Sequence, residues 1–175
     1  MKQLFALYFI LFSTITLAQN KVDNTMSQYL EDNGTMTYYS AVIDRMFDFM
    51  KTEFASAKVP DDVWTELSQV KSEALSEISE MISQAYAGHF SQSELQTMLD
   101  FYASETGKRI MSTDSLTETQ KKEQESFYES DLGQKISSST ESLNGILQKM
   151  TQEWSADLFT SVSEKLKAKG FTKQK

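Results

Sequence analysis

One ten-residue phrase occurs twice in this chain, and it constrains the fold more than any other feature of the sequence. The first copy, residues 101–110, reads FYASETGKRI, and the second, residues 127–136, reads FYESDLGQKI. Both copies follow the pattern F-Y-x-S-x-x-G-x-[KR]-I. A repeat at this period is typical of one supersecondary unit that is used twice, with each copy burying the apolar face of the other.

Each copy of the phrase is preceded by residues that are typical of a helix start. A serine or threonine and a carboxylate or amide side chain three positions later can satisfy each other's backbone amides as a capping box. The two pairs are Ser91 with Glu94 and Thr117 with Gln120. The repeat units are therefore expected to span about 90–110 and 116–136.

Within the phrase, the serine and the glycine have predicted structural roles. Ser104 and Ser130 are expected to end one helix and cap the next, and Gly107 and Gly133 to permit close approach of another backbone. The second copy replaces three apolar positions of its helix with polar residues, so this helix is expected to be largely exposed and anchored by its aromatic pair. The replacements are Lys121 for Leu95, Gln124 for Met98 and Glu125 for Leu99.

The first 18 residues have the pattern of a secretory signal peptide. Lys2 precedes an apolar run at residues 4–12, and small residues lead to a predicted cleavage site after Ala18. The apolar run is shorter than the roughly 20 residues of a membrane-spanning helix, and a retained anchor is the alternative. The mature domain is predicted to comprise residues 19–175.

The composition limits the classes of partner and the sources of stability. The chain has no cysteine, so neither disulfides nor a lipidated cysteine is available, and stability must come from a core. Its net charge is −8 at pH 7, which disfavours binding to phosphate backbones and anionic headgroups.

Apolar residues spaced by three and four predict an all-α fold, a single-domain bundle of about six or seven helices with two tandem capped helix-turn-helix units. Few residues interrupt helices, because the chain has one proline and six glycines. The expected helices are residues 22–31, residues 36–54, a third and longest helix from Pro60 to Gly88, the helices of the two repeat units, and a last helix that begins at a Ser138–Glu141 capping box and ends at Gly170.

The repeated phrase admits two interpretations. In the structural one, aromatic residues anchor the turn, serine caps the helix and glycine allows close packing. In the other, the tyrosines and nearby lysines line a ligand-binding cleft. The residues concerned are Phe101, Tyr102, Ser104, Gly107, Lys108, Phe127, Tyr128, Ser130, Gly133 and Lys135.

A capped helix followed by Phe-Tyr-x-Ser-x-x-Gly-x-Lys, in a small helical chain with a signal sequence, resembles the domain of unknown function 2059 family of bacterial envelope proteins. The resemblance covers residues 85–110 best and extends over 116–136. In that family a proline often follows the serine, where this chain has Glu105 and Asp131. The resemblance implies an α-helical fold and an exported, bacterial setting, and it implies no activity.

The sequence assigns no catalytic, cofactor-binding or metal-binding residue. The only histidine, His89, is expected in a loop between helices, and no cysteine nucleophile exists. Carboxylates share helical faces at three places, where a solvated surface is favoured over a metal site because no Glu-x-x-His motif accompanies them. These groups are Asp61 with Asp62, Asp44 with Asp48, and Glu73 with Glu77 and Glu80.

These observations favour an exported helical envelope protein that acts as a protein-interaction or structural module, through a protein partner or self-association. The alternative is a periplasmic carrier or chaperone for an apolar ligand, with a groove lined by methionine and aromatic side chains. A carboxylate-dependent hydrolase is the third hypothesis. The expected location is periplasmic or secreted, with no cofactor, no nucleic-acid partner and no stable membrane anchor after signal cleavage.

Overall fold

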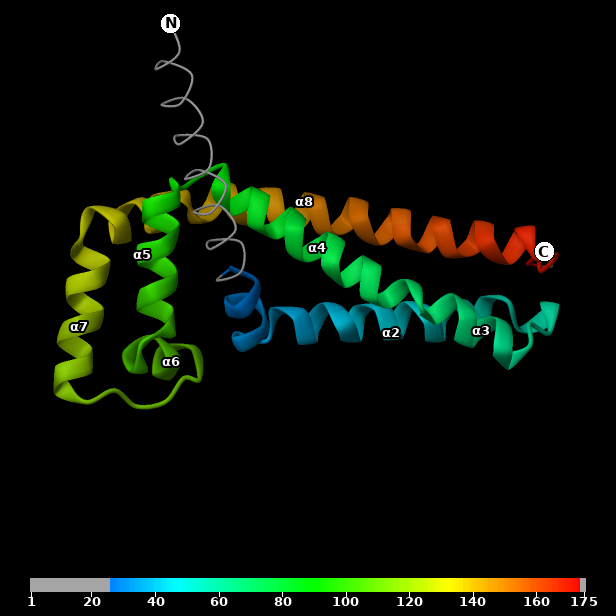
Figure 1. Ribbon diagram of the computed structural model, residues 1–175, viewed down its shortest axis with the longest axis horizontal. Coiled ribbons are helices and arrows are strands. Elements are labelled where there is room, and N and C mark those ends of the chain that lie inside the picture. Colours follow the sequence, from blue (N-terminus) through cyan, green and yellow to red (C-terminus); the bar gives the residue numbers. More distant parts are fainter. Residues whose placement is uncertain (1–25, 174–175) are drawn as a thin grey trace, which may run out of the picture. The chain divides into compact units, whose positions relative to one another are not determined.

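The computed structural model of the protein describes residues 26–173, and most of these residues are helical (Figure 1). Residues 26–32 form a helix, seven further α-helices follow from α2 to α8, and the described chain contains no strand. The all-α prediction of about six or seven helices is confirmed by the seven α-helices α2 to α8. The predicted signal peptide and the beginning of the first predicted helix lie outside the described residues.

The chain divides into two compact units that each combine separate stretches of sequence. The first unit consists of the described residues up to Asn33 together with Ser83–Asn144. The second consists of Gly34–Ile82 and the described residues from Gly145 onward.

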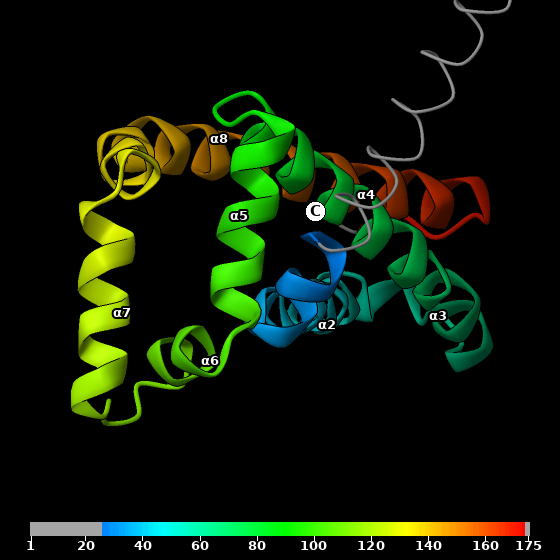
Figure 2. The ribbon, with the colours of Figure 1, turned by 60° about the vertical axis from the view of Figure 1, so that its left-hand side comes forward.

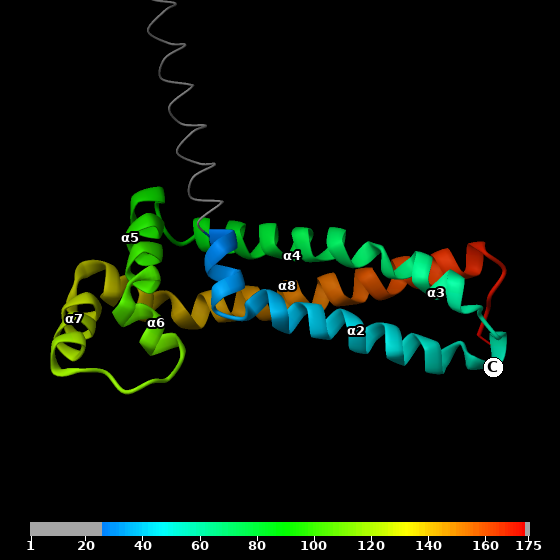
Figure 3. The same ribbon diagram turned by 60° about the horizontal axis from the view of Figure 1, so that its bottom comes forward.

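Three helices of the second unit run along one another: α2 (Thr35–Glu53), the first part of α4 (Val70–Ala87) and the second part of α8 (Asp131–Ala168). Figure 3 shows α2 and α8 pointing in the same direction and α4 in the opposite one. A 3₁₀ turn (Ala55–Ala57) and the short α3 (Asp61–Ser68) connect α2 to α4.

The core of the second unit is formed by the apolar stripes of these helices, because every third or fourth residue falls on the same helical face. Tyr39 of α2 packs edge-on against Trp154 of α8, with ring centroids 5.6 Å apart. The Tyr39 hydroxyl and the Thr151 hydroxyl lie 2.7 Å apart and form a hydrogen bond. Other buried residues of this unit are Ile43, Phe47, Met50, Phe54, Trp64, Leu67, Ala74, Ile78, Val162 and Leu166.

The first unit is built around the three helices of the repeat region, α5 (Gln92–Ala103), α6 (Glu105–Met111) and α7 (Glu118–Glu129), which follow one another in Figure 2. Helix α5 supplies most of the apolar side chains, whereas α7 has no buried residue. The exposure predicted for the helix of the second copy is therefore confirmed. Buried apolar residues of this unit are Met26, Leu30, Phe90, Leu95, Met98, Leu99 and Leu143.

The third predicted helix, from Pro60 to Gly88, is not continuous. It is divided into α3 and α4 at Gln69, whose N–H bonds the carbonyl of Glu66 in a tighter 3₁₀-type turn. The preceding Ser68 hydroxyl donates to the carbonyl of Thr65, and such local hydrogen bonds compete with helix continuation. The spacing of apolar residues does not reveal the break, because the apolar stripe continues at helical spacing on both sides of it.

The prediction that the last helix begins at Ser138 is wrong, as is the prediction that the third helix is the longest. Helix α8 begins at Asp131 and continues for 38 residues. Ser138 lies within it and donates its hydroxyl to the carbonyl of Lys135. Ser130 already caps the helix, and neither a proline nor a left-handed residue interrupts the chain before Ala168.

The predicted stop at Gly170 is confirmed by its geometry. Gly170 has φ +92°, its N–H bonds the carbonyl of Lys167, and the N–H of Phe171 bonds the carbonyl of Leu166. These two hydrogen bonds form a Schellman motif, which satisfies the last carbonyls of the helix. Two lysines of the C-terminal segment then pair with the other helices of the second unit, Lys169 with Glu66 at 2.8 Å and Lys173 with Glu53 at 2.7 Å.

Two glycines of this region should respond to alanine in opposite directions. We expect Gly170→Ala to lower the free energy of unfolding by about 1 kcal/mol, because an L-residue is strained at positive φ. Gly145→Ala should raise it by roughly 0.5–1 kcal/mol, because Gly145 is in a helix interior and a Cβ there meets nothing within 4 Å. Guanidinium unfolding followed by circular dichroism measures both, and changes of the same sign would contradict the assignment.

Candidate functional site

The repeated phrase forms a joint between two helices, seen first between α5 and α6. Ser104 is the residue between them, with extended backbone angles (φ −69°, ψ 164°). Its hydroxyl donates to the carbonyl of Phe101 at 2.6 Å and accepts from the N–H of Gly107 at 3.1 Å. One side chain therefore ends α5 and begins α6, as predicted from the sequence.

The joint between α7 and α8 has the same geometry. The hydroxyl of Ser130 donates to the carbonyl of Phe127 at 2.6 Å and accepts from the N–H of Gly133 at 3.1 Å. The helix that leads into each joint also begins with the predicted capping box, at Ser91 and at Thr117. The two copies of the phrase thus have the same local structure.

Glycine is required at each joint because the second helix touches the backbone of the first. A Cβ on Gly107 would lie 2.2 Å from the carbonyl oxygen of Phe101 and 2.5 Å from the Cα of Tyr102. A Cβ on Gly133 would meet Phe127 and Tyr128 in the same way. Backbone atoms cannot rotate away as a side chain does, so no residue larger than glycine fits at position 107 or 133. The predicted close approach between the backbones of the two helices is therefore confirmed.

The two copies pack on each other through equivalent residues. The rings of Phe101 and Phe127 are stacked with centroids 3.7 Å apart and planes 1° from parallel. The hydroxyls of Tyr102 and Tyr128 lie 3.3 Å apart. Each residue therefore meets its own counterpart, the arrangement of a self-complementary contact between two copies of one unit.

Tyrosine hydroxyls from several segments of the first unit gather near this contact. Tyr29 packs on Tyr102 with centroids 5.5 Å apart. Burial, followed by the hydrogen bond with Tyr128, raises the pKa of Tyr102 well above its usual value. Burial likewise raises the pKa of Tyr86 to about 12, with a smaller contribution from Tyr29. These phenols remain neutral at ordinary pH and serve as packed rings with polar tips.

An ion pair connects the second copy to the helix start of the first. Lys135 lies 2.7 Å from the carboxylate of Glu94, and its ammonium is 5.6 Å from the ring centroid of Phe90. Lys135 and then the amide and hydroxyl of Ser91 hold the pKa of Glu94 at about 2. Lys108, the other lysine of the phrase, is exposed and lies 3.8 Å from Glu105.

The cavity beside the phrase is small. It measures about 60 Å³, and its lining is mostly apolar, with Tyr29, Leu99, Tyr102 and Met111 among the contributing residues. Drug-sized ligands occupy about 300–1,000 Å³. The residues of the phrase are thus occupied mainly with each other and with the helix ends.

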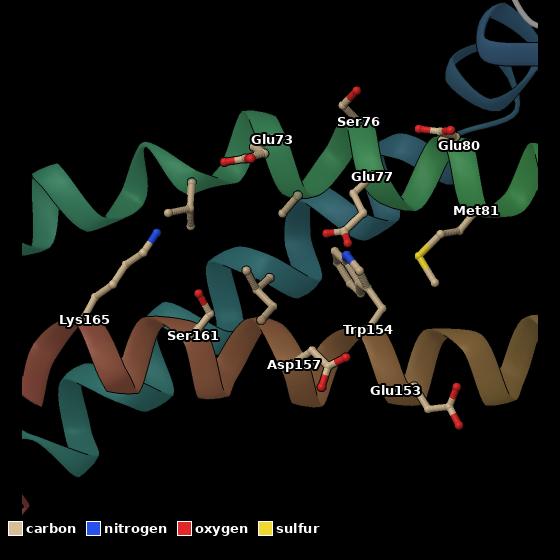
Figure 4. Close-up of a pocket in the computed structure, with 13 residues that line it drawn as sticks. Glu73, Ser76, Glu77, Glu80, Met81, Glu153, Trp154, Asp157, Ser161 and Lys165 are labelled. Atoms are coloured by element: carbon tan, nitrogen blue, oxygen red, sulfur yellow. The ribbon is translucent and has the colours of Figure 1, made fainter.

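A larger groove lies in the second unit, between α4 and α8 (Figure 4). Its volume is about 730 Å³. The apolar side chains that line it include Val70, Ala74, Met81 and Leu158. Carboxylates occur on both of its helices, and a single lysine lies at one end. The charged lining residues are Glu73, Glu77, Glu80, Glu153, Asp157 and Lys165.

Trp154 is the unusual residue of this groove. Its side chain is only 3% exposed, and its indole N–H has no hydrogen-bond acceptor among the described residues. Tyr39 covers the ring edge-on from α2, while Figure 4 shows the indole nitrogen on the side that faces the groove, with the Glu77 carboxylate directed toward it. A buried donor without an acceptor costs about 1–3 kcal/mol, so an acceptor that reached this N–H would remove that cost.

Comparison with family models matches this chain to DUF2059, described as an uncharacterized protein conserved in bacteria. The model matches twice, over residues 76–114 and again over residues 113–161. Residues 76–161 belong to this family. Searches of curated proteins and of solved structures give no match. The family description states no activity, so the site must be argued from its own geometry.

The two DUF2059 segments include both copies of the repeated phrase, where the sequence resemblance placed them. The second segment also includes Glu153, Trp154 and Asp157 of the groove. Sequence reasoning assigned the glutamates of α4 to a solvated face. The missing information was which helix lies against α4, because only this contact places carboxylates of two helices around one indole.

The remaining candidates from the sequence are not brought together. His89 is half-buried in the turn before α5, as expected. In the described part of the chain, no three His, Asp or Glu side chains converge as metal ligands. No described helix is both long and apolar enough to cross a membrane.

The joint glycines provide a direct test of the DUF2059 repeat geometry. We expect Gly107→Ala and Gly133→Ala each to lower the free energy of unfolding by about 3 kcal/mol, because the added Cβ displaces backbone. Gly88→Ala is the control, since its Cβ would make ordinary contact at 3.4 Å and should change stability by less than about 0.5 kcal/mol. Equal stability of all three variants in guanidinium unfolding would refute the close approach.

The Glu94–Lys135 pair predicts a specific acid sensitivity. Because the pKa of Glu94 falls from 4.5 to about 2 on folding, the ionised carboxylate stabilises the fold above pH 4.5. This contribution is lost as the pH drops from 4.5 toward 2. Glu94→Gln should therefore lower the unfolding temperature at neutral pH and weaken its dependence on pH below 4.5.

Thermal unfolding followed by circular dichroism from pH 2 to pH 7 measures this difference. Glu125→Gln, at an exposed position of α7, controls for loss of one negative charge. A Glu94→Gln profile parallel to that of the unaltered protein would show that the pair does not contribute.

Proposed function

We propose that this protein is an exported, non-catalytic binding module of the bacterial cell envelope, which holds a partner protein in the groove between α4 and α8. The observation that carries the proposal is the buried, unpaired N–H of Trp154 on the floor of an open groove. Buried polar groups in proteins almost always have a partner, so an exception at an open groove favours an incoming acceptor.

The division of roles between the two units supports a binding function. In the first unit, the residues of the repeated phrase are engaged in caps, stacked rings and backbone contacts, which suits a rigid scaffold. In the second, a groove of about 730 Å³ exposes apolar and acidic side chains together. Export is supported by the predicted signal peptide at residues 1–18.

A carrier for an apolar ligand draws less support from the described pockets. The mostly apolar cavity of the first unit measures about 60 Å³, and the large groove of the second is lined by many carboxylates. A lipid chain in that groove would desolvate charged groups without pairing them, which is unfavourable. A protein partner can bring charges of its own.

Photocrosslinking in the bacterial host tests the binding function. A benzoylphenylalanine at Ser161, which lines the groove, should give a discrete adduct with one partner, whereas the same group at the neighbouring exposed Thr160, outside the groove lining, should not. The triple variant E73Q/E77Q/D157N should abolish the Ser161 adduct while the protein stays folded by circular dichroism. Absence of an adduct at Ser161, or equal adducts at both positions, would contradict the proposal.

A further inference from the structure

We infer that the occupant of the groove is an amphipathic helix of a partner protein, with lysine or arginine on both sides of its apolar stripe. This inference rests on the proposed function and specifies the chemistry of the partner. A helix that lies on two neighbouring helices buries one apolar stripe between them and presents its flanks to their outer faces.

The charges of the groove determine the flanks of this helix. Glu73, Glu77 and Glu80 recur on α4 at the spacing of one helical face, and Glu153 and Asp157 do so on α8. Among the described residues, no cation lies within ion-pair distance of Glu73, Glu77 or Asp157. Unpaired carboxylates thus occur on both walls, Glu73 and Glu77 on α4 and Asp157 on α8, and they complement basic residues on both flanks of the occupant.

The floor determines the length and the stripe of the occupant. It extends along α4 from Val70 to Met81, a distance of about 16 Å or three helical turns. Ala74 lies within this stretch and is only 3% exposed, so it forms part of the closed floor on which apolar residues of the incoming helix would lie. An incoming helix with apolar residues spaced by three and four over three turns therefore matches this floor.

The indole N–H of Trp154 adds a polar requirement in the middle of the stripe. Backbone carbonyls inside a helix already accept hydrogen bonds, so the acceptor must be a side chain such as glutamine or asparagine. Glu77 turns toward a basic flank of the occupant and gives this acceptor access to the ring. One polar residue within an apolar stripe also fixes the register of a helix pair.

Lys165 sets the direction of the bound helix. It lies at the Glu73 end of the groove, whereas Met81 and Glu153 lie at the other end (Figure 4). The last carbonyls of a helix carry partial negative charge and its first amides partial positive charge. The occupant therefore binds with its C-terminus toward Lys165, parallel to α8.

Designed helical peptides test this chemistry in the mature protein. Trp64→Phe leaves Trp154 as the only tryptophan, so its fluorescence reports on the groove. Three peptides of about 18 residues are compared. Two share a leucine stripe with one central glutamine, and one of them carries lysine on both flanks while the other carries glutamate. The third has the composition of the lysine-flanked peptide in scrambled order. At an ionic strength of 0.15 M, where charges are screened beyond about 8 Å, we expect the lysine-flanked peptide to bind at least tenfold more tightly than either other peptide.

Charge reversal provides the matched control. E73K/E77K/D157K should reverse the preference, so that the glutamate-flanked peptide binds at least tenfold better than the lysine-flanked one. E125K/E129K/E141K reverses three exposed carboxylates elsewhere in the chain and should leave the preference unchanged. Replacing the central glutamine by leucine should weaken binding about tenfold, the loss expected for one buried hydrogen bond.

Each of the following outcomes would overturn the inference. Equal affinity for the three peptides would show that flank charge is not recognised, and an unchanged preference in E73K/E77K/D157K would place binding outside the groove. Displacement of the lysine-flanked peptide by equimolar spermidine would indicate a small polycation instead of a helix. If the benzoylphenylalanine at Ser161 crosslinks a partner in cells but none of the peptides binds, the proposed binding function is supported and the inferred basic amphipathic helix is rejected.

Discussion

The contact between glycine and backbone at the two helix joints is the constraint on which the first unit depends. With the Cα of Gly107 against the end of α5, and that of Gly133 against the end of α7, each pair of helices meets at a fixed angle. This angle directs Phe101 and Phe127 toward one another, and their stacking holds α7, a helix without a buried residue of its own. Helix propensity alone would leave a helix of this length marginal in water.

Trp154 contrasts with the thorough pairing of polar groups in these joints. Ser104 and Ser130 each satisfy a helix start and a helix end with one hydroxyl. Trp154, by comparison, is held by Tyr39, whose own hydroxyl bonds Thr151, so the ring is kept in an orientation that leaves its N–H unpaired. A ring fixed in this way does not lose side-chain entropy when an acceptor arrives, which favours binding at this position.

The sequence predicted local structure well and contacts between distant helices poorly. The capping boxes at Ser91 and Thr117, the joint glycines and the stop at Gly170 were predictable because each depends on residues within a few positions of one another. The break at Gln69 and the continuous start of α8 were missed, because a single side-chain hydrogen bond or a shared cap decides them. The groove could not be predicted, because it requires knowing that α4 and α8 are neighbours.

The acidic residues of the chain differ in their pairing between the two units. In the first unit, Glu94 is paired with Lys135, and Glu123 accepts a hydrogen bond from the buried Thr106. In the groove, Glu73 and Glu77 of α4 and Asp157 of α8 lie beside a shared apolar floor, and no cation of the described residues forms an ion pair with them. Holding like charges together on facing walls is unfavourable for the isolated protein, since they repel one another across a short distance. A cationic partner removes this repulsion and also buries the apolar floor of the groove. Both effects favour the bound state, and they do so independently of each other.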